Sequence, residues 1–462
     1  MRFPLGDFRL ALCAACALAL GACVADAQMS NGSTYPIDLP TTLRLAGAQN
    51  LDIQIAREAL KEAQANRVSA IEQFFPWLAP GIAYHRRDGM AQAVPAGTVS
   101  DTHFDSYAPG VTVVAQIVLG EAIYNALAAK QLSRAAGEAL EAQCQDSTLS
   151  AAQAYFDLVK TKALVEVAKQ SLETSQDYQQ QLHEAVAVGI AFKGDELRVQ
   201  TQTEIYQITL RQGLERQRVA AASLAQILHL DPAVELVPQD TGMTSLTLFD
   251  TTAPLDALVQ RAVRLRPELK QSQALVSATR DATDGAVYGP LIPAVGAQVF
   301  AGGLGGGHDN EPSNFGASED YLVGLSWRIG PGGLFDFGRI NASNARLAAV
   351  QLGAAKLHDT ITAQVVDNLA RVQSLSDQIA LARQSLATAD ETLRLTRARK
   401  QYGVGIVLED IQAQQSLNQA RSDYFTTVAE FNKAQYGLNR AVGGPPEPEP
   451  RQPDVPGSKP LP

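Results

Sequence analysis

The chain is poor in cysteine, and its few cysteines are badly placed for a disulfide framework. Of 4 cysteines among 462 residues, Cys13, Cys16 and Cys23 lie in or just after an N-terminal apolar segment. Removal of that segment would leave at most Cys23 and Cys144. A fold held together by several disulfides is therefore not expected.

The sequence also lacks the patterns that carry enzymatic or metal chemistry. Its 6 histidines are scattered without a pair at helical ligand spacing, and its 4 methionines form no thioether cluster. The glycine run 302–307 is not followed by Lys-Ser/Thr, so it is interpreted as a surface loop rather than a phosphate-binding loop. No Gly-x-Ser-x-Gly nucleophile turn is present. We therefore expect no enzyme activity, no metal and no cofactor.

Acidic residues outnumber basic ones, 48 against 38, which gives a formal net charge of -10 at pH 7. No basic cluster with interleaved aromatic residues occurs, which argues against a nucleic-acid partner. The 46% hydrophobic content predicts an ordered protein with ample apolar surface.

The N-terminus has the pattern of a signal peptide over residues 1–22. Arg2 and Arg9 precede the apolar run Leu10–Ala22. The sequence Leu20-Gly21-Ala22-Cys23 resembles a bacterial lipobox, in which Cys23 is lipidated, and it abuts the apolar run. Ala25-Asp26-Ala27 offers an ordinary cleavage site as the alternative.

Residues 41–240 and 250–442 carry the same ordered signals, which predicts an internal two-fold repeat. Asn50-Leu51-Asp52 and Arg266-Pro267-Glu268 each open a helical pattern, and Pro80 and Pro293 each precede a strand-like stretch. Residues 23–40 are expected to form an extended N-terminal lead, and the Pro-rich residues 443–462 a disordered tail.

Proline is absent from two long segments, between Pro109 and Pro232 and between Pro331 and Pro445. Strong helix formers fill both segments, and glycines interrupt each near its middle. Each segment therefore predicts a hairpin of two antiparallel helices, with on the order of 40–65 residues per helix and lengths of roughly 60–100 Å. Ala at inward spacings favours close packing, as a hollow cylinder or, alternatively, as a filamentous coiled coil.

Four strands of about ten residues are expected, the length that a tilted strand needs to span a membrane. Apolar and polar residues alternate most clearly in the last of them. Four strands cannot close on themselves, so membrane-spanning strands would require several copies of the chain to share one barrel. The alternative is one sheet of a soluble sandwich. The four stretches are Leu78–Arg87, Tyr107–Leu119, Val295–Ala301 and Tyr321–Ile329.

Over about residues 41–442 the chain resembles the TolC family of outer-membrane efflux and secretion channels. The order helix, two strands and long helical hairpin, given twice, carries this resemblance as a whole. Local stretches that resemble the family are Leu43–Asn50, Ala152–Leu158, Gly189–Asp195, Gly333–Arg339 and Gly403–Asp410.

The resemblance implies an α+β membrane protein in the outer membrane of a Gram-negative bacterium, with a large periplasmic part. It implies a homotrimer with a shared twelve-stranded transmembrane β-barrel and a long antiparallel α-helical barrel. A periplasmic adaptor would dock on the helical tip and connect it to an inner-membrane pump. The expected function is passive export of small molecules in a tripartite efflux system. The alternatives are a type I protein secretion channel and a non-channel periplasmic coiled-coil protein.

The two hairpin turns supply the remaining candidate residues. Gly189, Gly194, Asp195, Gly403 and Gly405 are predicted at tip turns that dock the adaptor. Glu409 and Asp410 are predicted as aperture carboxylates, three copies of each narrowing the mouth and disfavouring anions. The alternative for Asp195, Glu409 and Asp410 is stabilisation of a helix N-terminus. Gln412 and Gly405 stand where family members carry an acidic and a basic residue, respectively.

Overall fold

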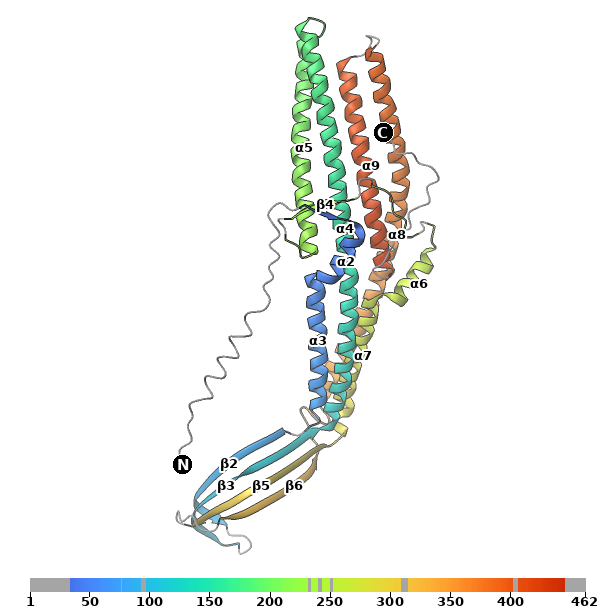
Figure 1. The fold of residues 1–462 in the computed structure, drawn as a ribbon. Helices are drawn as coiled ribbons and strands as arrows, with labels where there is room; N and C mark the ends of the chain where they lie inside the picture. Colours follow the sequence, from blue (N-terminus) through green and yellow to red (C-terminus); the bar gives the residue numbers. More distant parts are fainter. Residues whose placement is uncertain are drawn as a thin grey trace, which may run out of the picture.

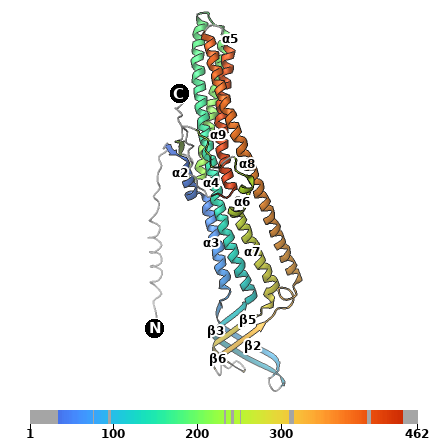
Figure 2. The ribbon, with the colours of Figure 1, turned by 90° about the vertical axis from the view of Figure 1, so that its right-hand side faces the viewer.

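The molecule is elongated, with a four-stranded sheet at one end and the ends of the long helices α4, α5, α8 and α9 at the other (Figure 1, Figure 2). The computed structural model describes residues 34–75, 77–92, 97–231, 234–239, 243–249, 252–308, 315–401 and 406–444. The signal peptide, Cys23, Gly403, Gly405 and the tail from residue 445 lie outside these ranges.

The two halves of the chain have the same order of elements. The first half contains α3 (Leu51–Glu72), β2 (Trp77–Gln92), β3 (Val99–Val118), α4 (Leu119–Ala187) and α5 (Lys193–Ile227). The second half contains α7 (Pro267–Tyr288), the short 3-10 helix η1 (Gly289–Leu291), β5 (Ala294–His308), β6 (Gly316–Ser326), α8 (Phe337–Gln401) and α9 (Val407–Ala441). The expected order of helix, two strands and helical hairpin is present in both halves, but α5 and α9, with 35 residues each, are shorter than the 40–65 residues expected.

The helices of each hairpin are unequal, with 69 residues in α4 against 35 in α5, and 65 in α8 against 35 in α9. The long helix of each hairpin continues past its partner towards the sheet, where α3 packs on α4 and α7 packs on both α4 and α8. None of the described helices contains a stretch long and apolar enough to cross a membrane.

A second, two-stranded sheet lies beside the middle of the helices and was not expected from the sequence. In it, β1 (Thr34–Ile37) pairs in parallel with β4 (Glu235–Pro238). The short helices α2 (Leu39–Gln49) and α6 (Leu255–Leu265) lie at the same level (Figure 1). Part of the expected N-terminal lead is therefore a paired strand. The main core forms here, around Ile37, Tyr155, Leu158, Leu224, Leu236, Val365 and Leu438.

The four-stranded sheet has the order β2-β3-β5-β6 with every pair antiparallel. The interpretation of residues 302–307 as a loop is wrong, because they lie within β5. Gly302 pairs with Gly110 and Gly305 pairs with Tyr107. The pairing partners of these glycines lie on β3, and the glycine run alone does not predict this pairing.

Candidate functional sites: a sheet with one apolar face and a polar helical tip

The strand register gives the four-stranded sheet one face that is apolar over most of its length. Residues directly opposite each other on paired strands share a face, and every second residue along a strand returns to it. We call this the apolar face. Its members are Ile82, Tyr84, Tyr107, Pro109, Val111, Val113, Ala115, Ile117, Val295, Ala297, Val299, Ala301, Tyr321, Val323 and Leu325.

The other side of the sheet, which we call the polar face, mixes polar, small and apolar residues. Its members include Thr112, Val114, Gln116, Val118, Gly296, Gln298, Phe300, Asp320, Leu322 and Ser326. On the apolar face of the single chain, Val323 is 76% exposed and Ile82 is 81% exposed. Within the described residues nothing covers these side chains, and so large an apolar surface indicates a lipid or protein contact.

Aromatic residues lie near both ends of the apolar face. At the end far from the helices, Tyr107 stands opposite Tyr84, and its ring stacks on Phe315 with centroids 6.0 Å apart. The Phe315 ring covers Gly303, where an added Cβ would lie 2.1 Å from its Cζ. At the helical end, Trp327 Nε1 donates to the backbone oxygen of Leu291 at 3.3 Å. Aromatic residues at the far end typically mark a border of a lipid layer, whereas Trp327 follows β6 and lines a cavity between the sheet and the helices.

Charged groups flank the apolar face, and on the edge strand β6 they begin with Glu319, which stands opposite Ala301 and accepts from the Tyr321 hydroxyl at 2.9 Å. The Tyr84 hydroxyl donates to Asp105 Oδ1 at 2.9 Å, and Arg86 Nε pairs with Asp88 Oδ2 at 2.7 Å. The apolar stretch on β3 therefore runs from Tyr107 to Ile117. At about 3.3 Å per residue, it is about 33 Å long.

At the opposite end of the molecule, Gly189 closes the turn after α4, as the sequence predicted for a hairpin break. Its φ of +79° is left-handed. The Gly189 amide donates to Val186 O at 3.0 Å and the Ile190 amide to Ala185 O at 2.8 Å, which is a Schellman helix end. Gly194 and Asp195 follow in the first turn of α5. Asp195 Oδ1 pairs with Arg198 Nη1 at 3.3 Å.

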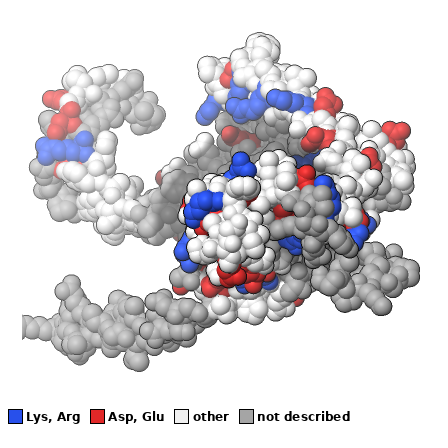
Figure 3. Space-filling view, turned by 90° about the horizontal axis from the view of Figure 1, so that it is seen from above, with Lys and Arg blue, Asp and Glu red and all other residues white. Residues whose placement is uncertain are grey.

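The structure separates the two predicted aperture carboxylates, although both lie in the first turn of α9. The Glu409 side chain is 38% exposed, and its Oε2 lies 3.3 Å from Arg399 Nη1. Asp410 is buried, with its Oδ1 3.9 Å from Arg397 Nε. Seen from the tip end, groups of both charges are interspersed on the surface (Figure 3).

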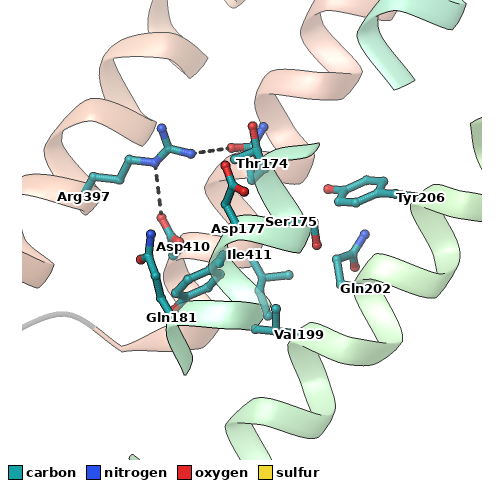
Figure 4. Close-up of a pocket in the computed structure, with 12 residues that line it drawn as sticks. Thr174, Ser175, Asp177, Gln181, Val199, Gln202, Tyr206, Arg397, Asp410 and Ile411 are labelled. Carbon is teal, nitrogen blue, oxygen red and sulfur yellow. Dashed lines mark hydrogen bonds and ion pairs between the residues drawn. The ribbon is translucent and has the colours of Figure 1, made fainter. Parts of the chain in front are cut away.

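Asp410 lies beside a cavity of about 590 Å³ between the two hairpins (Figure 4). Residues from α4, α5, α8 and α9 line this cavity. Burial, together with the nearby charges of Asp410 and Asp195, raises the pKa of Tyr178 to about 12. Tyr178 therefore stays protonated near Asp410 at neutral pH.

Towards the tip the contacts between the hairpins are polar, whereas in the main core Phe156 of α4 packs on Tyr436 of α9 with ring centroids 5.8 Å apart. Gln415 Nε2 donates to Gln202 Oε1 at 2.7 Å, and Asn418 Nδ2 donates to the Tyr206 hydroxyl at 3.1 Å. Neutral hydrogen bonds of this kind contribute about 1 kcal/mol each. The two hairpins are thus joined by polar contacts towards the tip and by apolar packing in the main core.

Sequence reasoning missed the basic residues at the tip. Arg397 and Arg399 lie in the last turns of α8 and face Asp410 and Glu409 across the hairpin. The stretch 394–400 contains four basic residues at a helix C-terminus, where cations are favoured. That signal could have drawn attention to them, although it does not identify their partners. Within the described residues, no cluster of side chains suits a metal ion.

Comparison with known proteins defines the class of protein. Residues 258–444 match the family model described as outer membrane efflux protein. No curated protein sequence matches the chain. Solved structures do, each covering 88% of this chain. A membrane protein from Pseudomonas aeruginosa has a TM-score of 0.75 and 20% identity, with 93% of its own chain covered.

Two further structures agree. The Campylobacter jejuni CmeC outer membrane channel has a TM-score of 0.74 and 16% identity, with 85% of its chain covered. The Vibrio cholerae outer membrane protein VceC has a TM-score of 0.73 and 18% identity, with 97% of its chain covered. The chain thus has the fold of the TolC-like outer-membrane channels and carries an outer membrane efflux protein domain in its second half. The fold predicted from the sequence is thus confirmed for the chain, and the family resemblance is supported by the match over residues 258–444.

Proposed function

We propose that this chain is one of three protomers of an outer-membrane channel, a passive conduit that exports small molecules in a tripartite efflux system. The observation that carries the proposal is the four-stranded sheet, whose edge strands β2 and β6 each pair on one side only. In lipid, unpaired backbone groups cost several kcal/mol each, so these edges require pairing with further copies of the chain. Three copies would give the twelve strands expected from the family resemblance.

The dimensions of the apolar face support a lipid contact. Its stretch of about 33 Å along β3 would rise about 25 Å if the strand were tilted by about 40°, which is the height of the apolar band in transmembrane barrels. The polar face would then line the water-filled interior, and the helices would continue the conduit into the periplasm.

Adjacent residues on opposite faces of β6 allow a matched test. Val323→Arg places a charge on the apolar face and should cost about 2–4 kcal/mol in the bilayer, which would prevent outer-membrane assembly. Leu322→Arg places the same charge on the polar face and should leave heat-modifiable trimers and channel conductance in place. If both variants assemble equally well, the sheet does not face lipid and the proposal is wrong.

The tip turns are proposed to dock the adaptor and to set the aperture. At the first turn, Ile190 is 82% and Phe192 is 81% exposed, and they flank the proposed docking residues Gly189, Gly194 and Asp195. Gly403 and Gly405 are proposed for the second turn. A double Ile190→Ser and Phe192→Ser variant should lose cross-linking to the adaptor while trimer formation persists. Retained cross-linking would argue against docking at this turn.

The aperture proposal concerns Glu409 and Asp410. Glu409→Gln with Asp410→Asn should enlarge single-channel conductance in planar bilayers and weaken block by cations, because it removes six carboxylates from the trimer. Glu391→Gln is a matched control, because Glu391 forms an exposed ion pair with Arg394 on α8, farther from the tip. Equal conductance of the double variant and the control would contradict a role in the aperture.

Lipid anchoring through Cys23 is a separate proposal. Metabolic labelling with palmitate should mark the wild-type chain and not a Cys23→Ala variant. Labelling of neither would favour ordinary signal cleavage after Ala27.

A further inference from the structure

A second cavity, of about 340 Å³, lies where the four-stranded sheet meets the helices. It is lined by the end of β3, the start of α4, the end of α7 with η1, and the segment between β6 and α8. The polar and charged side chains around it are Gln116, Glu121, Ser326, Arg328 and Arg339, with the indole of Trp327 beside them.

The cavity opens on the polar face of the sheet. Ser326 is paired with Ala294, and Ala294 with Val118, so these three residues form one row on that face. Gln116 stands two residues before Val118 and therefore projects to the same side. If the apolar face meets lipid, as proposed above, this cavity faces the interior of the conduit.

Two side chains of opposite charge, Arg328 and Glu121, line this cavity without forming an ion pair. In the part of the chain that the structure describes, neither the Arg328 guanidinium nor the Glu121 carboxylate has a hydrogen bond or an ion pair, and the Arg328 backbone oxygen accepts from the Leu334 amide at 2.8 Å. The Arg328 side chain lies along the turn before α8, where a Cβ added to Gly332 would be 3.4 Å from its Nη1. Arg339, by contrast, is partly engaged, because its Nη2 donates to Gly285 O at 3.4 Å.

This arrangement selects a chemical class of ligand. A guanidinium favours carboxylate or another oxyanion, a free carboxylate favours a protonated amine, and an indole favours a flat apolar body. A molecule with only one charge would leave one of the two fixed charges without a partner. A molecule that carries both charges, separated by an aromatic ring, would satisfy both.

We propose that this cavity is a transit-binding site for zwitterionic aromatic small molecules, held between Arg328 and Glu121 against Trp327. The inference rests on the proposed conduit function, since it assigns to that conduit a class of cargo. It commits to a soluble ligand rather than a lipid headgroup, because the cavity lies on the polar face.

Three probes built on one benzene ring test the proposal on the unmodified chain. They are 4-(aminomethyl)benzoate, which carries both charges, benzoate, which carries only the anion, and benzylammonium, which carries only the cation. The zwitterion should bind the purified protein in detergent at least about tenfold more tightly than either single-charge probe, as measured by calorimetry. Equal affinities for the three probes, or no binding of any, would overturn the proposal.

A spectroscopic readout can localise the binding. The chain has 2 tryptophans, so Trp77→Phe leaves Trp327 as the only indole reporter. The zwitterion should perturb its fluorescence with the same affinity as in calorimetry. Binding that leaves the Trp327 signal unchanged would place the ligand elsewhere and overturn the assignment.

Charge-neutralising variants identify the two ends of the ligand. Arg328→Gln should remove the advantage of the zwitterion over benzylammonium, and Glu121→Gln its advantage over benzoate. Arg346→Gln, an exposed α8 residue outside the cavity, should change neither. Should a variant fail to assemble, the three-probe comparison on the wild-type chain still decides. A control variant that lowers affinity as much as Arg328→Gln would contradict the assignment.

Two further arms separate the sources of failure. Probe binding in nanodiscs of phosphatidylglycerol should be unaffected when phosphatidylethanolamine is added, and competition by that lipid would show that its headgroup is the occupant instead. Conductance of the same preparation in planar bilayers tests the conduit itself. Normal channels that bind no probe would refute only the cavity assignment, whereas absence of channels would refute the proposed function.

Discussion

The two halves of the chain make the same junction with different chemistry. Asn50 separates α2 from α3 with φ −59° and ψ 129°, and Arg266 separates α6 from α7 with φ −61° and ψ 123°. Both side chains reach a backbone oxygen at the end of a hairpin helix. Asn50 Nδ2 donates to Ile227 O at 3.0 Å in α5, and Arg266 donates to Arg440 O at 3.4 Å in α9.

No charged side chain takes part in the first junction, where the Asn50 side chain both accepts and donates hydrogen bonds. Asn50 Oδ1 accepts the amides of Asp52 and Ile53 at 2.8 and 3.3 Å, which caps α3, while its amide group binds Ile227 O. Asp52 is exposed and takes no part beyond its backbone. A short amide can donate and accept at once, so no further charge is needed here.

The second junction is ionic. A guanidinium can donate but cannot accept, so Arg266 caps nothing with its side chain and requires anionic or carbonyl partners. Glu268 lies 3.9 Å from Arg266 and forms a short ion pair with Arg440, which also binds Asp146 at 2.7 Å. The comparison shows that one backbone geometry can be held by a neutral amide or by a group of four charges in which the two arginines are buried. Only the second should respond to charge removal.

The largest expected effect comes from removing charge at the ionic junction. Glu268→Gln leaves the buried Arg266 and Arg440 with less compensation and should lower the free energy of unfolding by about 2–3 kcal/mol, allowing for 22% exposure of the Glu268 side chain. Asp52→Asn, at the corresponding position of the first half, should cost no more than about 0.5 kcal/mol. Urea unfolding of purified protein at one fixed concentration, followed by circular dichroism, measures both. Equal losses would show that the junctions do not differ in kind.

Acid should affect the same junction. Burial alone would raise the pKa of Glu268, but hydrogen bonding and attraction from Arg440, together with Arg266, outweigh it and hold the pKa below its ordinary value. The stability that this carboxylate contributes is therefore present above the ordinary value of 4.5 and is lost as the pH falls through the lowered pKa. The difference between wild type and Glu268→Gln should shrink below about pH 4.5 in unfolding curves taken at several pH values. A constant difference would contradict the ionic account.

Sequence reasoning anticipated these junctions as helix starts, and the reason is local. Asn is a strong N-cap, and proline is tolerated at a first helical position. Asn50 and Pro267 therefore predict helix starts from local sequence alone. The same holds for Gly189, whose left-handed φ closes a hairpin. The residues that satisfy these junctions are distant in the sequence. Neither Ile227 nor Arg440 could be assigned from a local pattern.

The errors and omissions have the same origin. Residues 302–307 form part of β5 because β3 is long enough to pair with them and Phe315 covers the glycines, and both facts are tertiary. At the tip, the acidic first turn of α9 was predicted from the sequence. The division into an exposed Glu409 and a buried Asp410 depends on how the hairpins pack, which the periodicity of one helix does not determine.

The ends of the two shorter hairpin helices provide a second comparison. Gly443 follows α9 with φ +70°, and His229 follows α5 with φ +52°. A Cβ added to Gly443 would lie 2.9 Å from the Arg266 amide nitrogen. Gly443→Ala should therefore cost about 2 kcal/mol, from the left-handed backbone and from this contact at the ionic junction. His229→Ala should be nearly neutral, because a side chain already occupies the left-handed position. Thermal unfolding of both variants at equal concentration measures the contrast, and a neutral Gly443→Ala would remove it.

The smallest expected effect is a gain. The His229 amide donates to Gln226 O at 3.1 Å and the Leu230 amide to Ala225 O at 2.8 Å, so α5 ends in the same hydrogen-bonding pattern as α9. Glycine adopts that conformation without the steric cost that histidine bears, although it loses more entropy on folding. His229→Gly should thus raise the free energy of unfolding by up to about 1 kcal/mol and make the first half end as the second does. A loss of stability instead would mean that the imidazole stabilises this position by more than the left-handed backbone costs. The two helix ends would then be stabilised in different ways.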